Sequence, residues 1–162
     1  MKKKLLIIVI VMLLCLLYLS LFPVKWSIDR ECKAYLLTTN NTMETKELSV
    51  RIKGEYKFYL FSSDTFTGTF EIEGFPETLD NVILKLDHGV ADLVYHRWDG
   101  FKLYSTSFGM ISTDFNLKNF VILKGDASGW IDLGGNILNA IISENMNISD
   151  IEAFQEKLLE KN

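Results

Sequence analysis

The feature that most constrains this chain is an uncharged apolar run near its N-terminus. Three lysines at positions 2–4 are followed by 18 residues, Leu5 to Phe22, without a charge. As a helix at about 1.5 Å per residue, this run extends roughly 27 Å, close to the ~30 Å hydrocarbon core of a bilayer. A lone segment in lipid must bond its backbone amides internally, as a helix does. Residues 1–22 therefore predict a basic tip and a transmembrane signal anchor, with the lipid bilayer as the partner of residues 5–22.

The charges around this run predict its orientation. Lysines on the short N-terminal side favour a cytoplasmic N-terminus, so we expect a single-pass protein of the cell membrane with its C-terminal domain outside. A cleaved secretory signal is the alternative, although its apolar core usually runs ~7–15 residues and ends at small residues. The exit from the run, residues 19–25, has no small-x-small pair. A lipoprotein signal would need a small residue before its cysteine, and Leu14 precedes Cys15.

Composition excludes two broad classes of protein. Hydrophobic residues make up 48 % and charged residues 23 % of the 162 positions, which is typical of a folded chain and not of a wholly disordered one. The balance of 17 Lys and Arg against 21 Asp and Glu is acidic and argues against nucleic acid as a partner. Residues 23–45 are expected to be a juxtamembrane linker, in which Lys25, Arg30 and Lys33 form a small basic cluster at the lipid headgroups.

From residue 46 the apolar residues alternate with a period of two, which indicates β-strands. Leu48, Val50 and Ile52, for example, alternate with polar neighbours. Asp99-Gly100 is the most diagnostic turn, since Asp-Gly supplies the positive φ angles of a two-residue hairpin. Because no amphipathic helix intervenes between the strands, we predict an antiparallel β sandwich or barrel-like sheet. Further strands are expected over 56–61, 66–73, 82–86, 90–98, 101–108, 119–124 and 130–133.

The end of the chain has a different pattern. Ser149 and Glu152 match a capping box, and apolar residues then recur at helical spacing, so a C-terminal α-helix is expected over 149–161. Residues 137–143 are ambiguous between a last strand and a short helix. Together, residues 46–162 are predicted to form one extracytoplasmic β domain that ends in this helix.

Residues that could carry chemistry are scattered. His88 is expected in a turn and His96 late in a strand, about 13 Å from Asp92, which is too far for the two side chains to share a metal. Glu71 and Glu73 lie on one strand face, expected to be a solvated sheet surface. We therefore assign no catalytic, metal-binding or cofactor-binding residue, expect no cofactor, and leave the binding residues open.

Cysteine and tryptophan give weaker signals. Cys32 is the only cysteine expected outside the membrane, so an intramolecular disulfide is not expected. An unpaired thiol and a Cys32–Cys32 bridge between two chains both stay open. Trp26, Trp98 and Trp130 are expected in core or interface packing, with a carbohydrate-stacking surface as the alternative.

The order of the parts carries a resemblance. A basic tip at 2–4, one apolar helix, a β-rich outer region and a terminal helix at 149–161 resemble the architecture of small single-pass, membrane-anchored proteins of Gram-positive bacteria. The resemblance covers the chain in outline only. It implies a membrane location and transfers no catalytic residue.

These patterns favour a non-enzymatic protein whose outer β domain binds or senses something at the cell surface. The region around His88, His96 and Trp98 is the first place to look for such recognition. One alternative is an accessory subunit that docks a larger membrane complex through the membrane helix or the stripe at 151–159. The other is a cell-envelope hydrolase with scattered catalytic carboxylates.

Overall fold

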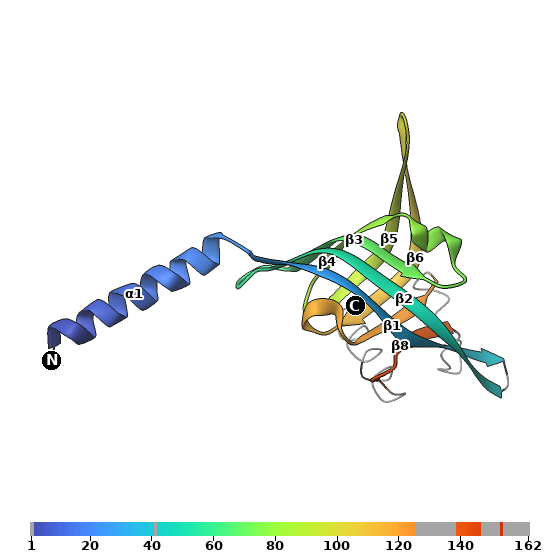
Figure 1. Ribbon diagram of the computed structural model, residues 1–162, viewed down its shortest axis with the longest axis horizontal. Helices are drawn as coiled ribbons and strands as arrows, with labels where there is room; N and C mark the ends of the chain where they lie inside the picture. The colour runs from blue at the N-terminus through green and yellow to red at the C-terminus, as the bar shows by residue number, and fades with distance from the viewer. Residues whose placement is uncertain (1, 41, 126–138, 147–152, 154–162) are drawn as a thin grey trace.

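One helix followed by a β-barrel makes up the computed structural model, which describes residues 2–40, 42–125, 139–146 and 153. Helix α1 (Lys2–Leu21) extends away from the barrel (Figure 1). Phe22 lies between the end of the helix and Pro23, and because the residue before a proline avoids helical backbone angles, the helix ends before Phe22. The mainly β class expected from the sequence is confirmed.

The described apolar side chains of α1 are exposed. From Leu5 to Tyr18, the described large apolar side chains are 45–65 % exposed. In the part of the chain that the structure describes, no helix is long and apolar enough to cross a membrane. The helical conformation expected for the apolar run is thus confirmed, whereas its role as a transmembrane helix is not supported.

Eight antiparallel strands form a closed barrel, which is the second of the two predicted architectures. Each strand pairs with the next along the chain, and β8 pairs back onto β1. Among the described residues, closure gives each strand of the wall a neighbour on both sides. The strands are β1 (Val24–Asn40), β2 (Thr42–Phe58), β3 (Asp64–Ile72), β4 (Asn81–Leu86), β5 (Val90–Asp99), β6 (Lys102–Thr113), β7 (Phe120–Lys124) and β8 (Asn139–Ser143), with short 3-10 helices η1 (Pro76–Leu79) and η2 (Phe115–Leu117).

Side chains fill the barrel interior. In β4, Val82, Leu84 and Leu86 are buried while the residues between them are exposed. The rings of Phe70 and Phe120 meet edge to face at 5.3 Å between centroids. An eight-stranded barrel is just wide enough for side chains to fill it, so the period-two pattern of the sequence builds the core directly.

The segment 23–45 was expected to be a linker, but it contains β1 and the beginning of β2. Strand β1 pairs with β2 along its whole length and with β8 over Ala34–Thr38. Its alternation is blurred in the sequence. The polar Arg30 faces inward with the core positions, while the outward-facing Leu37 is buried in a second apolar cluster on β7 and β8.

Other boundaries differ from the prediction in ways that matter for the surface. The strand expected over 56–61 ends at Phe58, and Leu60 and Phe61 lie exposed in the β2–β3 loop. The ambiguous segment 137–143 contains strand β8, so the strand alternative is confirmed. The strand expected over 130–133 and the helix expected over 149–161 lie outside the described residues.

The loop between β6 and β7 covers the barrel end nearest α1. Phe115 packs against Trp26 and Tyr56, with ring centroids 4.9 and 5.8 Å away. The Trp26 indole Nε1 donates a hydrogen bond of 2.6 Å to Asn116 Oδ1, and Arg30 donates to the Asn116 carbonyl. Trp26 therefore takes part in core packing, as expected.

Candidate binding surface on the β5–β6 finger

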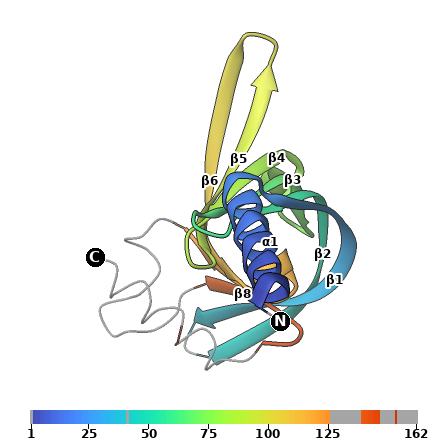
Figure 2. The same cartoon turned by 90° about the vertical axis from the view of Figure 1, so that its left-hand side faces the viewer.

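The hairpin of β5 and β6 projects beyond the barrel wall (Figures 1 and 2). Strand β4 pairs with the outer part of β5 only at Asn81–His96 and Val82–Tyr95. Beyond His96, β5 pairs with β6 alone. We call residues 97–104 the finger.

A two-residue turn closes the finger. Asp99 pairs with Lys102, so the central residues are Gly100 and Phe101, one position later than the Asp99-Gly100 turn that the sequence predicted. Gly100 has a φ of 60°, which a glycine adopts without steric strain. The shift places Phe101 at the tip.

The two faces of the finger have different chemistry. Residues directly opposite each other in an antiparallel pair share a face, so Trp98 and Leu103 lie together on one face. The pairs Arg97–Tyr104 and Asp99–Lys102 lie on the other. The Lys102 ammonium lies 5.9 Å from the centre of the Tyr104 ring. The finger is therefore an amphipathic ribbon with one apolar face.

Exposure of this apolar face is high. Trp98 is 71 %, Phe101 102 % and Leu103 49 % exposed. Single exposed apolar residues are ordinary on protein surfaces, but a contiguous group of large ones marks a site of interaction. Aromatic residues are also the side chains most enriched where partners dock. We take the finger as the candidate binding surface.

The two histidines do not form a site together. His96 lies at the base of the finger, where its Nδ1 is 3.0 Å from Ser105 Oγ. His88 lies in the β4–β5 turn with a φ of 51°, and its Nε2 is 3.8 Å from a carboxylate oxygen of Asp87. Across the described ranges no group of three or more His, Cys, Asp or Glu residues could hold a metal ion.

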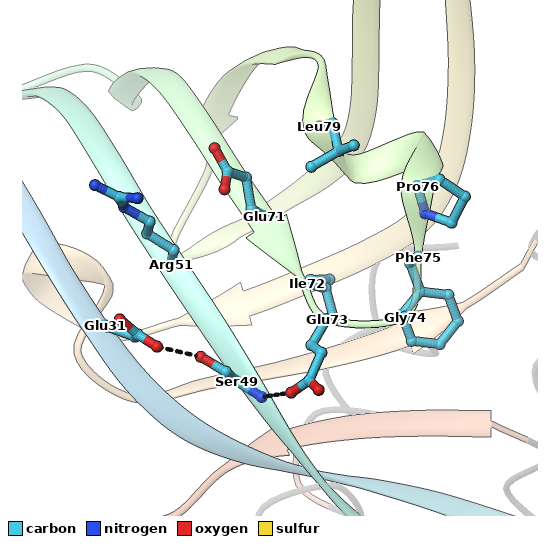
Figure 3. A pocket seen from close by; sticks show the side chains of 10 residues that line it. All are labelled: Glu31, Ser49, Arg51, Glu71, Ile72, Glu73, Gly74, Phe75, Pro76 and Leu79. Atoms are coloured by element: carbon cyan, nitrogen blue, oxygen red, sulfur yellow. Dashed lines mark hydrogen bonds between the residues drawn. The ribbon is translucent and has the colours of Figure 1, made fainter.

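An open pocket of about 520 Å³ lies on the outer wall beside η1 (Figure 3). Arg51 lies between Glu31 and Glu71 in the register of β1, β2 and β3. Ser49 donates from its hydroxyl to Glu31, at 2.7 Å, and from its backbone amide to Glu73, at 2.9 Å. Three carboxylates against one guanidinium give this pocket a negative charge, which would attract a cationic group.

Cys32 faces the barrel interior and is half-buried. Its Sγ lies 3.6 Å from the Val50 carbonyl oxygen, and burial raises the pKa of its thiol above the ordinary value. A raised pKa lowers the thiolate fraction and slows reaction with other thiols or with maleimides. Cys32 is a free cysteine in the described part of the chain, and an intermolecular Cys32–Cys32 bridge stays a prediction that nothing here tests.

The basic cluster expected at the membrane is not formed as predicted. Arg30 points inward, and Lys33 forms an ion pair of 2.7 Å with Glu47. Lys25 instead lies directly opposite Lys57 in the pairing of β1 with β2. This pairing depends on strand register, which the sequence did not reveal.

Sequence reasoning identified Trp98 but not the residues that accompany it. Phe101, Leu103 and Tyr104 were assigned to an ordinary strand, because alternation alone does not show whether a strand has neighbours on both sides. The diagnostic turn was the available signal, since its position predicts which side chains lie at a tip. Trp130 lies outside the described residues. Comparison with protein-family models, curated proteins and solved structures finds no match for this chain, so its function must be inferred from its own residues.

Proposed function

We propose that this protein is a non-enzymatic, single-pass membrane protein whose barrel stands outside the cell and uses the finger to bind or sense a partner. The observation that carries the proposal is the exposed apolar face of the finger, formed by Trp98 and Leu103, together with Phe101 exposed at its tip. The chemistry of this face suits an apolar groove on a protein or another envelope component.

Attachment to the membrane is the part of the proposal that depends on α1. The run from Leu5 to Phe22 is uncharged, and its described apolar side chains face outward on every side. A helix that is hydrophobic all round requires an apolar environment, either a bilayer or the interior of a larger assembly. Three lysines at positions 2–4 favour a cytoplasmic N-terminus.

The finger is suited to contact rather than to catalysis. A two-stranded ribbon in water is marginally stable and readily adapts to a partner. Its polar face carries Arg97, Asp99 and Lys102, which would lie at the rim of a complex around the apolar face. Burial of Trp98 and Phe101 against a partner would contribute most of the affinity, since aromatic residues dominate such interfaces.

An accessory subunit of a membrane complex is the alternative function, and α1 favours it. The apolar surface of this helix could pack against helices of another membrane protein instead of lipid alone. Crosslinking in intact cells separates the alternatives. Crosslinks from Leu13 to another protein would support the accessory role, and recovery of monomer alone would contradict it.

The binding role is tested by a photoreactive phenylalanine analogue at Phe101, introduced into the full chain in its host. We expect a discrete crosslinked product from this position and none from the same analogue at Ile83, which is 58 % exposed on β4 outside the finger. The triple variant Trp98→Ala, Phe101→Ala, Leu103→Ala should fail to complement a deletion strain. Full complementation by the triple variant would overturn the proposal.

Topology is tested with an accessible cysteine, because Cys32 itself is half-buried. The variant Phe101→Cys in a Cys32→Ala background should react with a membrane-impermeant maleimide on intact cells. Labelling only after lysis would place the barrel in the cytoplasm and contradict the outside location.

A further inference from the structure

A second exposed apolar group lies at the opposite end of the barrel, where α1 joins β1. In Figure 1 the β2–β3 loop reaches the junction between α1 and β1. The pairing of β1 with β2 agrees with this, because it begins at Val24, three residues after the end of α1 at Leu21, and Val24 lies opposite Phe58 at the end of β2. The β2–β3 loop therefore starts beside the segment that joins α1 to β1.

The side chains at this junction are large and apolar. Phe61 is 79 %, Phe22 55 % and Leu60 37 % exposed. The Phe22 ring also contacts Tyr18 in the last turns of α1, with centroids 5.1 Å apart. Aromatic and large apolar residues at the end of a membrane-embedded helix are typical of the lipid interface.

Two lysines lie on the adjoining ends of β1 and β2, each three residues along the chain from one of these apolar residues. Lys25 and Lys57 are directly opposite each other on the outer face of β1 and β2, an arrangement in which like charges repel. Lys57 forms an ion pair of 3.1 Å with Glu55. Because Lys25 and Lys57 together carry two positive charges and Glu55 one negative charge, the three side chains have a net positive charge. Anionic lipid headgroups would neutralise that charge.

We propose that Phe22, Leu60 and Phe61, together with Lys25 and Lys57, form a rim that rests on the bilayer. This inference rests on the proposed membrane attachment through α1. Leu60 and Phe61 enter the boundary between headgroups and acyl chains, and the two lysines contact the phosphates. The rim gives the barrel a second membrane contact and holds the finger, at the far ends of β5 and β6, away from the membrane.

The test uses the full chain in vesicles of phosphatidylcholine with phosphatidylglycerol. A fluorescent probe is attached at Phe61→Cys, at Leu13→Cys in α1, or at Leu79→Cys, each in a Cys15→Ser, Cys32→Ala background. Quenching is measured with lipids that carry a nitroxide near the headgroup and, separately, with lipids that carry it deep in the acyl chain. We expect strong quenching at position 61 by the headgroup nitroxide, strong quenching at position 13 by the acyl-chain nitroxide, and little at position 79 by either, since residue 79 is exposed beyond the opposite end of β3.

The outcomes separate the inference from the proposed function. Quenching at position 13 with none at 61 would overturn the rim and leave the membrane attachment intact. Absence of quenching at position 13 would overturn the attachment itself.

The role of Lys25 and Lys57 is tested by comparing vesicles with and without the anionic lipid. Phosphatidylglycerol should raise quenching at position 61 above the value in phosphatidylcholine alone, and the double variant Lys25→Gln, Lys57→Gln should abolish this increase. Lys46→Gln, an exposed lysine at the other end of β2, should leave the increase unchanged. Equal quenching in both lipids would contradict the role of the lysines.

Discussion

Strands β5 and β6 run through both the barrel wall and the finger, yet their side chains in the two regions differ in burial and their backbones in the number of neighbouring strands. In the wall, Leu93 on β5 and Ile111 on β6 are fully buried, with other strands on both sides. In the finger, Trp98 and Leu103 continue the same strands and face solvent. The side chains compared are large and apolar in both the wall and the finger. The number of neighbouring strands decides whether an apolar side chain stabilises the fold or is available to a partner.

The largest expected effect is on the wall. Phe70→Ala removes a fully buried ring that packs on Phe120, and should lower the free energy of unfolding by about 3–5 kcal/mol. The matched change Phe101→Ala at the finger tip should stay within about 0.5 kcal/mol of the wild type. Urea titration of the full chain in detergent micelles measures both. Equal losses would mean that the finger is part of the cooperative fold.

Close approach of backbone within the wall gives the next largest effect. Gly54 faces Gly68 across β2 and β3, and a Cβ at Gly54 would lie 2.3 Å from the Thr67 carbonyl oxygen. Gly54→Ala should therefore destabilise the barrel by about 1–3 kcal/mol through overpacking. Gly54→Val, a larger side chain at the same backbone angles, should cost more than Gly54→Ala. Equal losses for the two variants would refute the packing explanation.

A buried hydroxyl gives a smaller effect with a pH dependence. Tyr95 donates a 2.6 Å hydrogen bond to the Phe70 carbonyl oxygen, so Tyr95→Phe should cost about 1–2 kcal/mol at neutral pH. Burial, reinforced by the charge of Glu77, raises the pKa of Tyr95 above its ordinary value.

Because the unfolded chain loses this proton above about pH 10 while the folded chain keeps it, stability should fall as the pH rises past that value. The fall should be shallower in Tyr95→Phe. Urea titrations at neutral and alkaline pH make the comparison. Parallel curves for the wild type and Tyr95→Phe would show that Tyr95 is not the group responsible.

The smallest expected effect concerns the free energy of local opening of the finger. Amides of residues 98–103 should exchange with solvent through local opening, well before those of Leu93 and Ile111 in the same strands. Hydrogen exchange followed by mass spectrometry resolves the two halves. Uniform protection along both strands would show that the finger opens only with the whole barrel.

Several parts of this protein could be predicted from the sequence because they depend on local patterns. Alternation in residues 48–52 and 82–86 predicted strands, and the apolar run after the N-terminal lysines predicted a helix. Strand β1 was missed, since the inward-facing Arg30 and the buried outward-facing Leu37 weaken its alternation.

Local patterns in the chain are enough to predict the class of secondary structure, the apolar character of α1 and a tight turn near Gly100. Closure of the sheet, the position of Lys25 opposite Lys57 and the extension of β5 and β6 beyond their neighbours become visible only in the folded barrel. The two groups of features differ in the range of the interactions that produce them. Backbone conformation and hydrophobic periodicity act between residues close in the chain, whereas register, closure and exposure depend on pairing between strands that are distant in it.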